Sequence, residues 1–203
     1  MNIKRAKILL GSFVGFAAFS SPLNVFATTY SSDVEVQFNF NSEISIVVDH
    51  ADIEILDLTP GASKDSNEIG ITVSTNNLVG YTASATVGSS QNATTNMTHT
   101  NGTNTFASIA TDASLASLTT DNTWGYSTST DNGTSWANLS GLPLYTDTAK
   151  QIAYTDSPAS DTIKFKINAK SATSQPAGDY TNVINFNVVA NVPPRDFTDI
   201  LTL

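Results

Sequence analysis

The densest group of possible metal ligands in the chain consists of four acidic residues within nine positions: Asp49, Asp52, Glu54 and Asp57. Carboxylate oxygens are the ligands that Ca²⁺ prefers, and extracellular modules bind this ion weakly. Asp52 and Glu54 alternate with apolar residues, so both carboxylates would project from one face of an extended segment. The pattern first of all predicts a solvated strand face. A weak calcium site is the alternative, because the spacing is not that of an EF-hand loop.

The usual catalytic side chains are scarce. The chain has no cysteine and two histidines, His50 and His99, which lie too far apart in sequence to suggest a zinc site. No serine lies in a G-x-S-x-G elbow. Eighteen acidic residues would allow a carboxylate pair for glycoside hydrolysis, but nothing in the sequence selects two of them. We therefore predict no catalytic residue and no cofactor beyond the calcium alternative.

The segment 129–136 reads S-T-D-N-G-T-S-W and resembles the Asp-box of sialidases and related propeller proteins. In that motif an aspartate caps a tight hairpin by accepting backbone N–H groups, and a glycine takes a positive φ. The resemblance implies a structural hairpin built from Ser129, Asp131, Gly133 and Trp136. Sialidase activity is not expected, because those enzymes clamp their substrate with three arginines and the mature chain would keep only Arg195.

Two further aromatic groups have expected structural roles. The hairpin register places Trp124 and Tyr126 on one face and Trp136 on the other, where an exposed ring could stack on a sugar. Near the last strand, Gly178 permits a tight turn, and Tyr180 can bury its ring while its hydroxyl returns to a preceding carbonyl. That arrangement is the tyrosine corner of sandwich domains. The alternative is a tyrosine that only begins a strand.

The first 27 residues predict export. Three basic residues precede an apolar run over 8–19, and Val25-Phe26-Ala27 offers the pattern that a signal peptidase cuts after. The run is shorter than the roughly twenty residues of a membrane helix. We therefore expect a signal peptide over 1–27, an extracellular or cell-surface location, and no membrane insertion of the mature chain.

The charge of the predicted mature chain restricts its partners. Three of the nine basic residues lie in the leader, so six remain against eighteen acidic residues, a net charge of −12. A protein that binds nucleic acid neutralises phosphates with clustered Lys and Arg. Nucleic acid is therefore excluded as a partner.

Apolar and polar residues alternate through most of the remaining chain, which is typical of strands with one wet face. The alternation predicts strands over 34–40, 44–48, 53–55, 69–73, 80–87, 124–129, 152–154, 163–169 and 180–190. About ten strands predict an all-β antiparallel sandwich of the immunoglobulin-like type over 28–192, with a closed barrel as the alternative. We also expect a meander over 34–87, a loop or edge hairpin over 89–105, and a helical turn capped by Asp112. Residues 193–203 would form a C-terminal tail.

Three strings follow one another along the chain: T-N-N-L-V-G-Y at 75–81, W-G-Y at 124–126 and P-A-G-D-Y at 176–180. As a set they resemble uncharacterised secreted surface proteins of bacteria, described as pilus-like or adhesin-like. The match covers roughly residues 33–192. The resemblance implies an immunoglobulin-like sandwich and a place at the cell surface, but no activity.

Two classes of function are compatible with these observations. The preferred one is a non-catalytic structural or adhesive module that binds a glycan, a neighbouring cell or copies of itself through loops or strand edges. The alternative is a carbohydrate-binding module or a carboxylate-based carbohydrate-active enzyme. Short hydroxyl and amide side chains, strong acidity and few catalytic groups favour the first. The apolar residues of the tail could add a strand to a neighbouring subunit.

Overall fold

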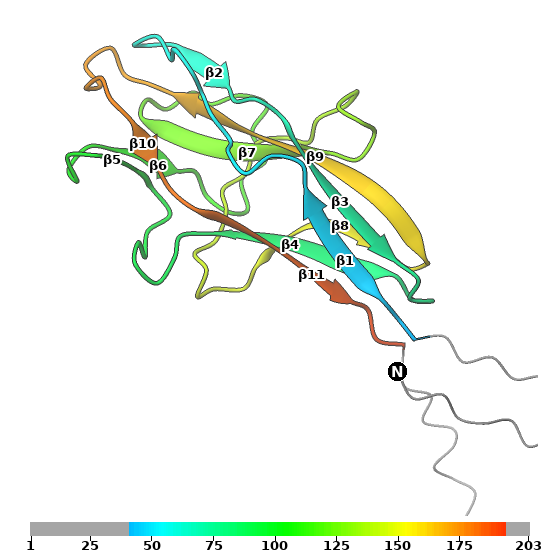
Figure 1. Cartoon of the computed structure of the whole chain (residues 1–203). Coiled ribbons are helices and arrows are strands. Elements are labelled where there is room, and N and C mark those ends of the chain that lie inside the picture. The colour runs from blue at the N-terminus through cyan, green and yellow to red at the C-terminus, as the bar shows by residue number, and fades with distance from the viewer. Residues whose placement is uncertain (1–40, 194–203) are drawn as a thin grey trace, which may run out of the picture. The chain divides into compact units, whose positions relative to one another are not determined.

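The computed structural model describes residues 41–193, and that range contains eleven strands and no helix (Figure 1). The strands are β1 (Ile44–Val48), β2 (Ser63–Asp65), β3 (Ile69–Thr75), β4 (Tyr81–Val87), β5 (Met97–His99), β6 (Thr105–Ser108), β7 (Thr123–Ser129), β8 (Lys150–Thr155), β9 (Ala159–Lys170), β10 (Tyr180–Thr181) and β11 (Ile184–Ala190). The predicted strand over 34–40, the predicted signal peptide and the tail from residue 194 lie outside the described residues.

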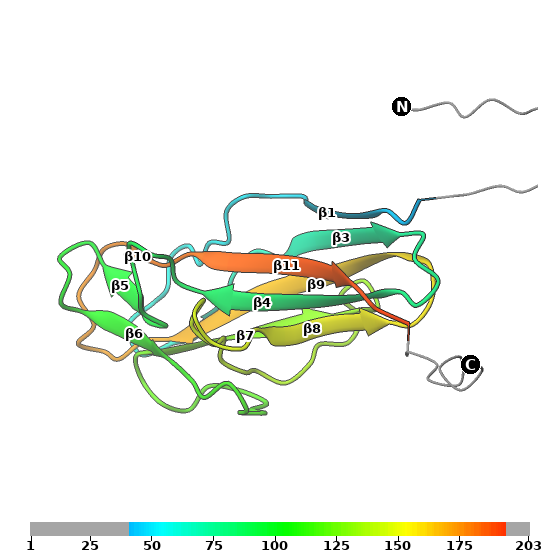
Figure 2. The same ribbon diagram turned by 90° about the horizontal axis from the view of Figure 1, so that it is seen from below.

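The strands form two sheets that share one core. The larger sheet has the order β1-β3-β9-β7-β6-β5-β10, with β2 also paired to β9, and the smaller sheet has the order β11-β4-β8. β6 and β7 pair in parallel, whereas the other strand pairs are antiparallel. Figure 2 shows β11, β4 and β8 lying along the larger sheet. The prediction of an all-β sandwich is confirmed.

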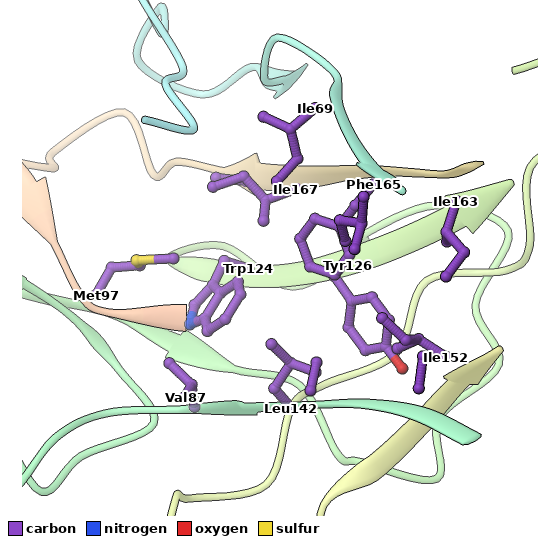
Figure 3. Packing of buried hydrophobic residues seen from close by; sticks show 14 of the residues in the cluster. Ile69, Val87, Met97, Trp124, Tyr126, Leu142, Ile152, Ile163, Phe165 and Ile167 are labelled. Atoms are coloured by element: carbon purple, nitrogen blue, oxygen red, sulfur yellow. The ribbon is translucent and has the colours of Figure 1, made fainter. Parts of the chain in front are cut away.

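The core lies between the inner faces of the two sheets. Every second residue along β3, along β4 and along β9 from Ile163 onwards is buried, as the alternation predicted. Trp124 on β7 is fully buried, and its Nε1 donates to the Thr95 carbonyl at 3.0 Å. Beside it Tyr126 stacks on Phe165 with ring centroids 5.2 Å apart (Figure 3). Because each fully buried large side chain contributes about 1.5–3 kcal/mol, this aromatic centre is a main source of stability.

The meander predicted over residues 34–87 is wrong for the described part of that range, which begins at residue 41. β1 pairs with β3, but the next strand, β4, lies in the smaller sheet between β11 and β8. The turn that joins β3 to β4 therefore crosses from one sheet to the other. Period-two alternation marks which side of a strand is buried but does not name its partner, so it could not distinguish a hairpin from this crossing.

Three local predictions also need correction. Residues 53–55 form no ladder, because the N–H and C=O of Glu54 are both bonded to the single residue Asn67. The strand predicted over 180–190 is split into β10 and β11 at Asn182, whose side-chain amide donates to two carbonyls of the 94–96 loop. The helical turn after Asp112 is absent from the described residues, because Leu115 pairs instead with Leu139 in a β-bridge.

Replacing Tyr81 with phenylalanine should cost about 1 kcal/mol of unfolding free energy. The Tyr81 side chain is 1% exposed, and its hydroxyl donates to Asp161 Oδ2 at 3.0 Å. Since Asp161 is exposed, water can replace the lost partner, which keeps the cost small. Burial and the Asp161 carboxylate raise the pKa of Tyr81 to about 12 from 10.0. The wild-type advantage should therefore be constant below pH 10 and fall as the pH rises towards 12.

Urea unfolding at several pH values measures this difference. Tyr154→Phe is the matched control, because the Tyr154 side chain is 58% exposed and should lose almost nothing. Equal losses in the two variants would contradict a stabilising role for the Tyr81 hydroxyl.

Candidate functional site

The acidic residues singled out as calcium candidates do not converge. Asp49 Oδ1 accepts bonds from Gly70 N at 2.8 Å and from His50 Nδ1 at 2.9 Å, so it extends the β1–β3 ladder past Val48. The Gly70 backbone bond and then the His50 bond hold the pKa of Asp49 below its ordinary value. Asp52, Glu54 and Asp57 are exposed. Within residues 41–193, no three Asp, Glu, His or Cys side chains form a group that could hold a metal ion.

The Asp-box segment forms a tight turn after β7. Asp131 Oδ1 accepts bonds from the Ser135 N–H at 2.8 Å and the Ser129 hydroxyl at 2.6 Å, and Ser129 Oγ accepts from Gly133 N at 2.9 Å. Gly133 has φ of 84°, and the preceding Asn132 also has a positive φ. The chain then returns along β7 through bonds such as Ala137 N to Thr128 O. Ser129, Asp131 and Gly133 thus build a turn, and the Asp131 carboxylate is occupied by donors.

Trp136 lies on the opposite side of this turn from the core. Its ring is half-buried, and Lys166 Nζ lies 4.2 Å from the ring centroid. By contrast Trp124 and Tyr126 point into the core. The lysine covers part of the surface that a sugar ring would need for stacking.

Replacing Asp131 with asparagine should remove an acid-sensitive part of the protein's stability. The bonds from Ser129 and then Ser135 lower the pKa of Asp131 to about 2 from 3.8. A carboxylate whose pKa is lower in the folded state stabilises the fold above its unfolded pKa. The wild type should therefore be more stable than Asp131→Asn above about pH 4, and the difference should vanish as the pH falls to about 2.

Urea unfolding between pH 7 and pH 2, followed by tryptophan fluorescence, tests this expectation. Asp156→Asn serves as control, because within residues 41–193 the Asp156 carboxylate accepts no hydrogen bond, and this variant should track the wild type. A difference between wild type and Asp131→Asn that does not change with pH would argue against the prediction.

The Gly178–Tyr180 segment forms a compact corner. Tyr180 Oη donates to the Pro176 carbonyl at 2.9 Å, and the ring packs edge-on against Phe106 and His99 with centroids 4.8 Å away in each case. Gly178 has φ of 138°, and a Cβ there would lie 2.2 Å from His99 Nε2. No local pattern indicated that His99 packs here, because His99 and Ala177, which it contacts, are 78 positions apart.

Above this corner lies a cleft of about 1080 Å³. One wall comes from the segment 48–58, and the other comes from residues 175–182 with Ile184 and Phe186 of β11. The deeper part is apolar and is formed by Met97, Phe106, Trp124, Ile167 and Ala169. Exposed carboxylates stand on the rim, among them Asp52, Glu54 and Asp179. The cleft is therefore acidic at its mouth and hydrophobic inside.

The cleft lies beside one edge strand of each sheet, β1 of the larger sheet and β11 of the smaller one. Within the described residues β1 pairs only with β3, and β11 pairs only with β4. The two strands run next to each other without forming a ladder (Figures 1 and 2). Ile53 and Ile55 are half-buried against the core from the first wall. An open strand edge beside an apolar surface is the arrangement to which an extended peptide can add as a strand.

Comparison with protein-family models, curated proteins and solved structures finds no match to this chain. The resemblance to secreted bacterial surface proteins, and with it the immunoglobulin-like assignment, therefore stays a prediction. Among residues 41–193, no helix is long and apolar enough to cross a membrane.

Proposed function

We propose that this chain is a non-catalytic structural or adhesive module of a bacterial cell surface, which binds a partner or copies of itself through its open strand edges. The observation that carries the proposal is the cleft between the segment 48–58 and β11, with its apolar interior and acidic rim. Monomeric proteins usually cover such edges, because an open edge invites pairing with another chain. An edge left open beside an apolar surface therefore supports a role in association.

Two further features support a structural role over a chemical one. Three acidic side chains accept two hydrogen bonds each, and all three serve the fold: Asp49 extends a ladder, Asp65 ties β2 to β9, and Asp131 caps a turn. Asparagine amides act in the same way, and the Asn191 amide ties Val79 and Thr155 together through their carbonyls at 2.8 and 2.7 Å. Polar side chains of these types stabilise loops without cross-links, which suits an exported chain that has no cysteine.

Cell fractionation with immunogold labelling tests the proposal. The label should lie on the outer surface of cells that produce the full chain, or on material extending from it, and the extracted protein should begin at Thr28. Label confined to the cytoplasm would overturn the proposal. Turnover of a polysaccharide by the purified mature protein would favour the carbohydrate-active alternative.

A further inference from the structure

The first wall of the cleft offers unpaired backbone groups. Consecutive residues of an extended segment direct their N–H and C=O groups to opposite edges. The N–H and the C=O of Glu54 both bond to Asn67, which lies between β2 and β3. Ile53 and Ile55 therefore direct theirs towards the cleft, and neither makes a backbone hydrogen bond within the part of the chain that the structure describes. This wall can accept a strand.

The second wall is equally incomplete. Along β11 the inward residues are only half-buried and the residues between them are exposed. On β4, which is paired on both sides, the inward residues are buried completely. Phe186 contacts the core ring Phe165 edge-on at 5.1 Å but still lines the cleft. One more strand beside β11 would cover the apolar surface that these half-buried residues leave open.

The cleft and the ends of the described chain lie at opposite ends of the sandwich. Asn76 Nδ2 donates to the Asn41 carbonyl at 3.0 Å, and Asn77 Nδ2 donates to the Asn191 carbonyl at 2.9 Å. Both ends are thus held at the turn between β3 and β4. The cleft begins at Val48, where β1 ends, and includes the start of β11 at Ile184. Asn41, the first described residue, therefore lies at the end of the sandwich opposite the cleft.

Residues 34–40 are suited to fill such a cleft. They read V-E-V-Q-F-N-F, with four apolar side chains on one face and three polar ones on the other. Seven extended residues span about 23 Å. The C-terminal tail has no comparable alternation, because Ile200 and Leu201 are adjacent and Asp199 interrupts its apolar set. The segment 34–40 directly precedes Asn41 in the sequence, and Asn41 lies at the end of the domain opposite the cleft.

We propose that residues 34–40 of one copy insert as a strand into the cleft of a second copy, between the segment 48–58 and β11. Val34, Val36, Phe38 and Phe40 then pack on the apolar floor, and the inserted backbone pairs with the free edges. The proposal deepens the proposed function, on which it rests, by naming the partner as a second copy of this chain. Because the donated segment is attached at Asn41, at the end opposite the cleft, the contact does not close on itself, and repetition produces a filament.

Insertion into the same copy does not give this packing. Asn76 Oδ1 also accepts a hydrogen bond from the Glu43 N–H at 2.6 Å. With the bond from Asn76 to the Asn41 carbonyl, it keeps residues 41–43 in line with β1. A segment that folded back at Phe40 would have to pass the eight residues from Asn41 to Val48 before reaching the cleft. The seven residues 34–40 would be used up on the way. Only the polar residues 28–33 would then reach the cleft.

Charge substitutions on alternate faces of the segment test the proposal in the mature full-length chain. Val36→Asp with Phe38→Asp places two carboxylates on the apolar floor, and the molar mass by light scattering should fall to that of a monomer. Gln37→Asp with Asn39→Asp adds the same charge to the other face and should keep the assembly. Measurement at about 0.15 M salt or above limits repulsion between Glu35 and the acidic rim. Loss of assembly in both variants, or in neither, would overturn the proposal.

Disulfide trapping identifies the acceptor, because the chain contains no cysteine of its own. A Phe38→Cys protein mixed with an Ile184→Cys protein should form a crosslinked heterodimer under mild oxidation. Tyr154→Cys on β8, the opposite edge of the smaller sheet, is the control and should not crosslink. Equal crosslinking to both positions would contradict insertion at β11. A monomeric wild type that immunogold still places on the cell surface would end this inference and leave the proposed function standing.

Discussion

Trp124→Ala should lower the free energy of unfolding by about 3–5 kcal/mol, the range found when a fully buried aromatic side chain is truncated. Trp124 is 0% exposed and lies between the two sheets, in contact with the core from both sides. Truncation leaves a cavity there and also leaves the Thr95 carbonyl without its Nε1 donor. Since domains are typically stable by about 5–15 kcal/mol, the variant should be close to unfolding at room temperature.

Urea unfolding followed by far-ultraviolet circular dichroism measures the loss, because both tryptophans contribute to fluorescence. The matched control is Trp136→Ala, which removes a half-buried ring. This ring makes a cation–π contact with Lys166, whose Nζ lies 4.2 Å from the ring centroid. That contact accounts for about 0.5–1 kcal/mol. Similar losses in the two variants would mean that the aromatic core does not lie at Trp124.

Gly80→Ala should also destabilise the fold strongly, by about 1–2 kcal/mol for the left-handed backbone and about 1–3 kcal/mol more for crowding. Gly80 has φ of +69°, and a Cβ at this position would lie 2.2 Å from the Thr155 carbonyl oxygen. That oxygen belongs to the main chain at the end of β8 and accepts a bond from Asn191, so it cannot move independently. The turn that crosses between the sheets would have to shift.

Gly102→Ala separates the two contributions. Gly102 has a similar φ of +76°, but a Cβ there would meet nothing within 4 Å. Only the backbone cost applies, so the melting temperature of Gly102→Ala should fall clearly less than that of Gly80→Ala. If the two variants lost the same stability, close packing at Gly80 would not be the reason for glycine.

The inserted-strand proposal gives these stability measurements a functional consequence. Trp124 and Phe106 form part of the cleft floor as well as the core. A change that loosens the floor should therefore weaken assembly together with folding. The charge substitutions in residues 34–40 lie outside the described domain and change no residue of its core, so assembly and stability can be measured separately.

Local patterns in the sequence were sufficient for most of the long strands and for the Asp-containing turn. Side chains of a strand alternate whatever its partner is, so Ile69, Ile71 and Val73 predicted a buried face without any knowledge of β9. The spacing of Ser129, Asp131 and Gly133 predicted a turn because all of its bonds fall within eight residues. Tyr180 lies four residues after the carbonyl that its hydroxyl reaches, which is again a local relation.

The pairing of strands and the cleft depended on contacts between distant segments. β3 and β4 are consecutive in sequence, yet they lie in different sheets. Ile53 and Ile55 alternate like strand residues, but Asn67 takes the bonds of Glu54, and no strand within residues 41–193 forms a ladder with them. The four acidic residues near them are close in sequence and do not gather around one point.

The amino-acid sequence alone determined an acidic, all-β chain with strands of one buried face and a tight Asp-containing turn, because alternation and turn chemistry act over a few residues. Only the tertiary structure decided that residues 48–58 and 175–186 face each other across an open cleft. The reason is physical: which edges meet depends on how two sheets share one core, and that packing joins residues more than one hundred positions apart.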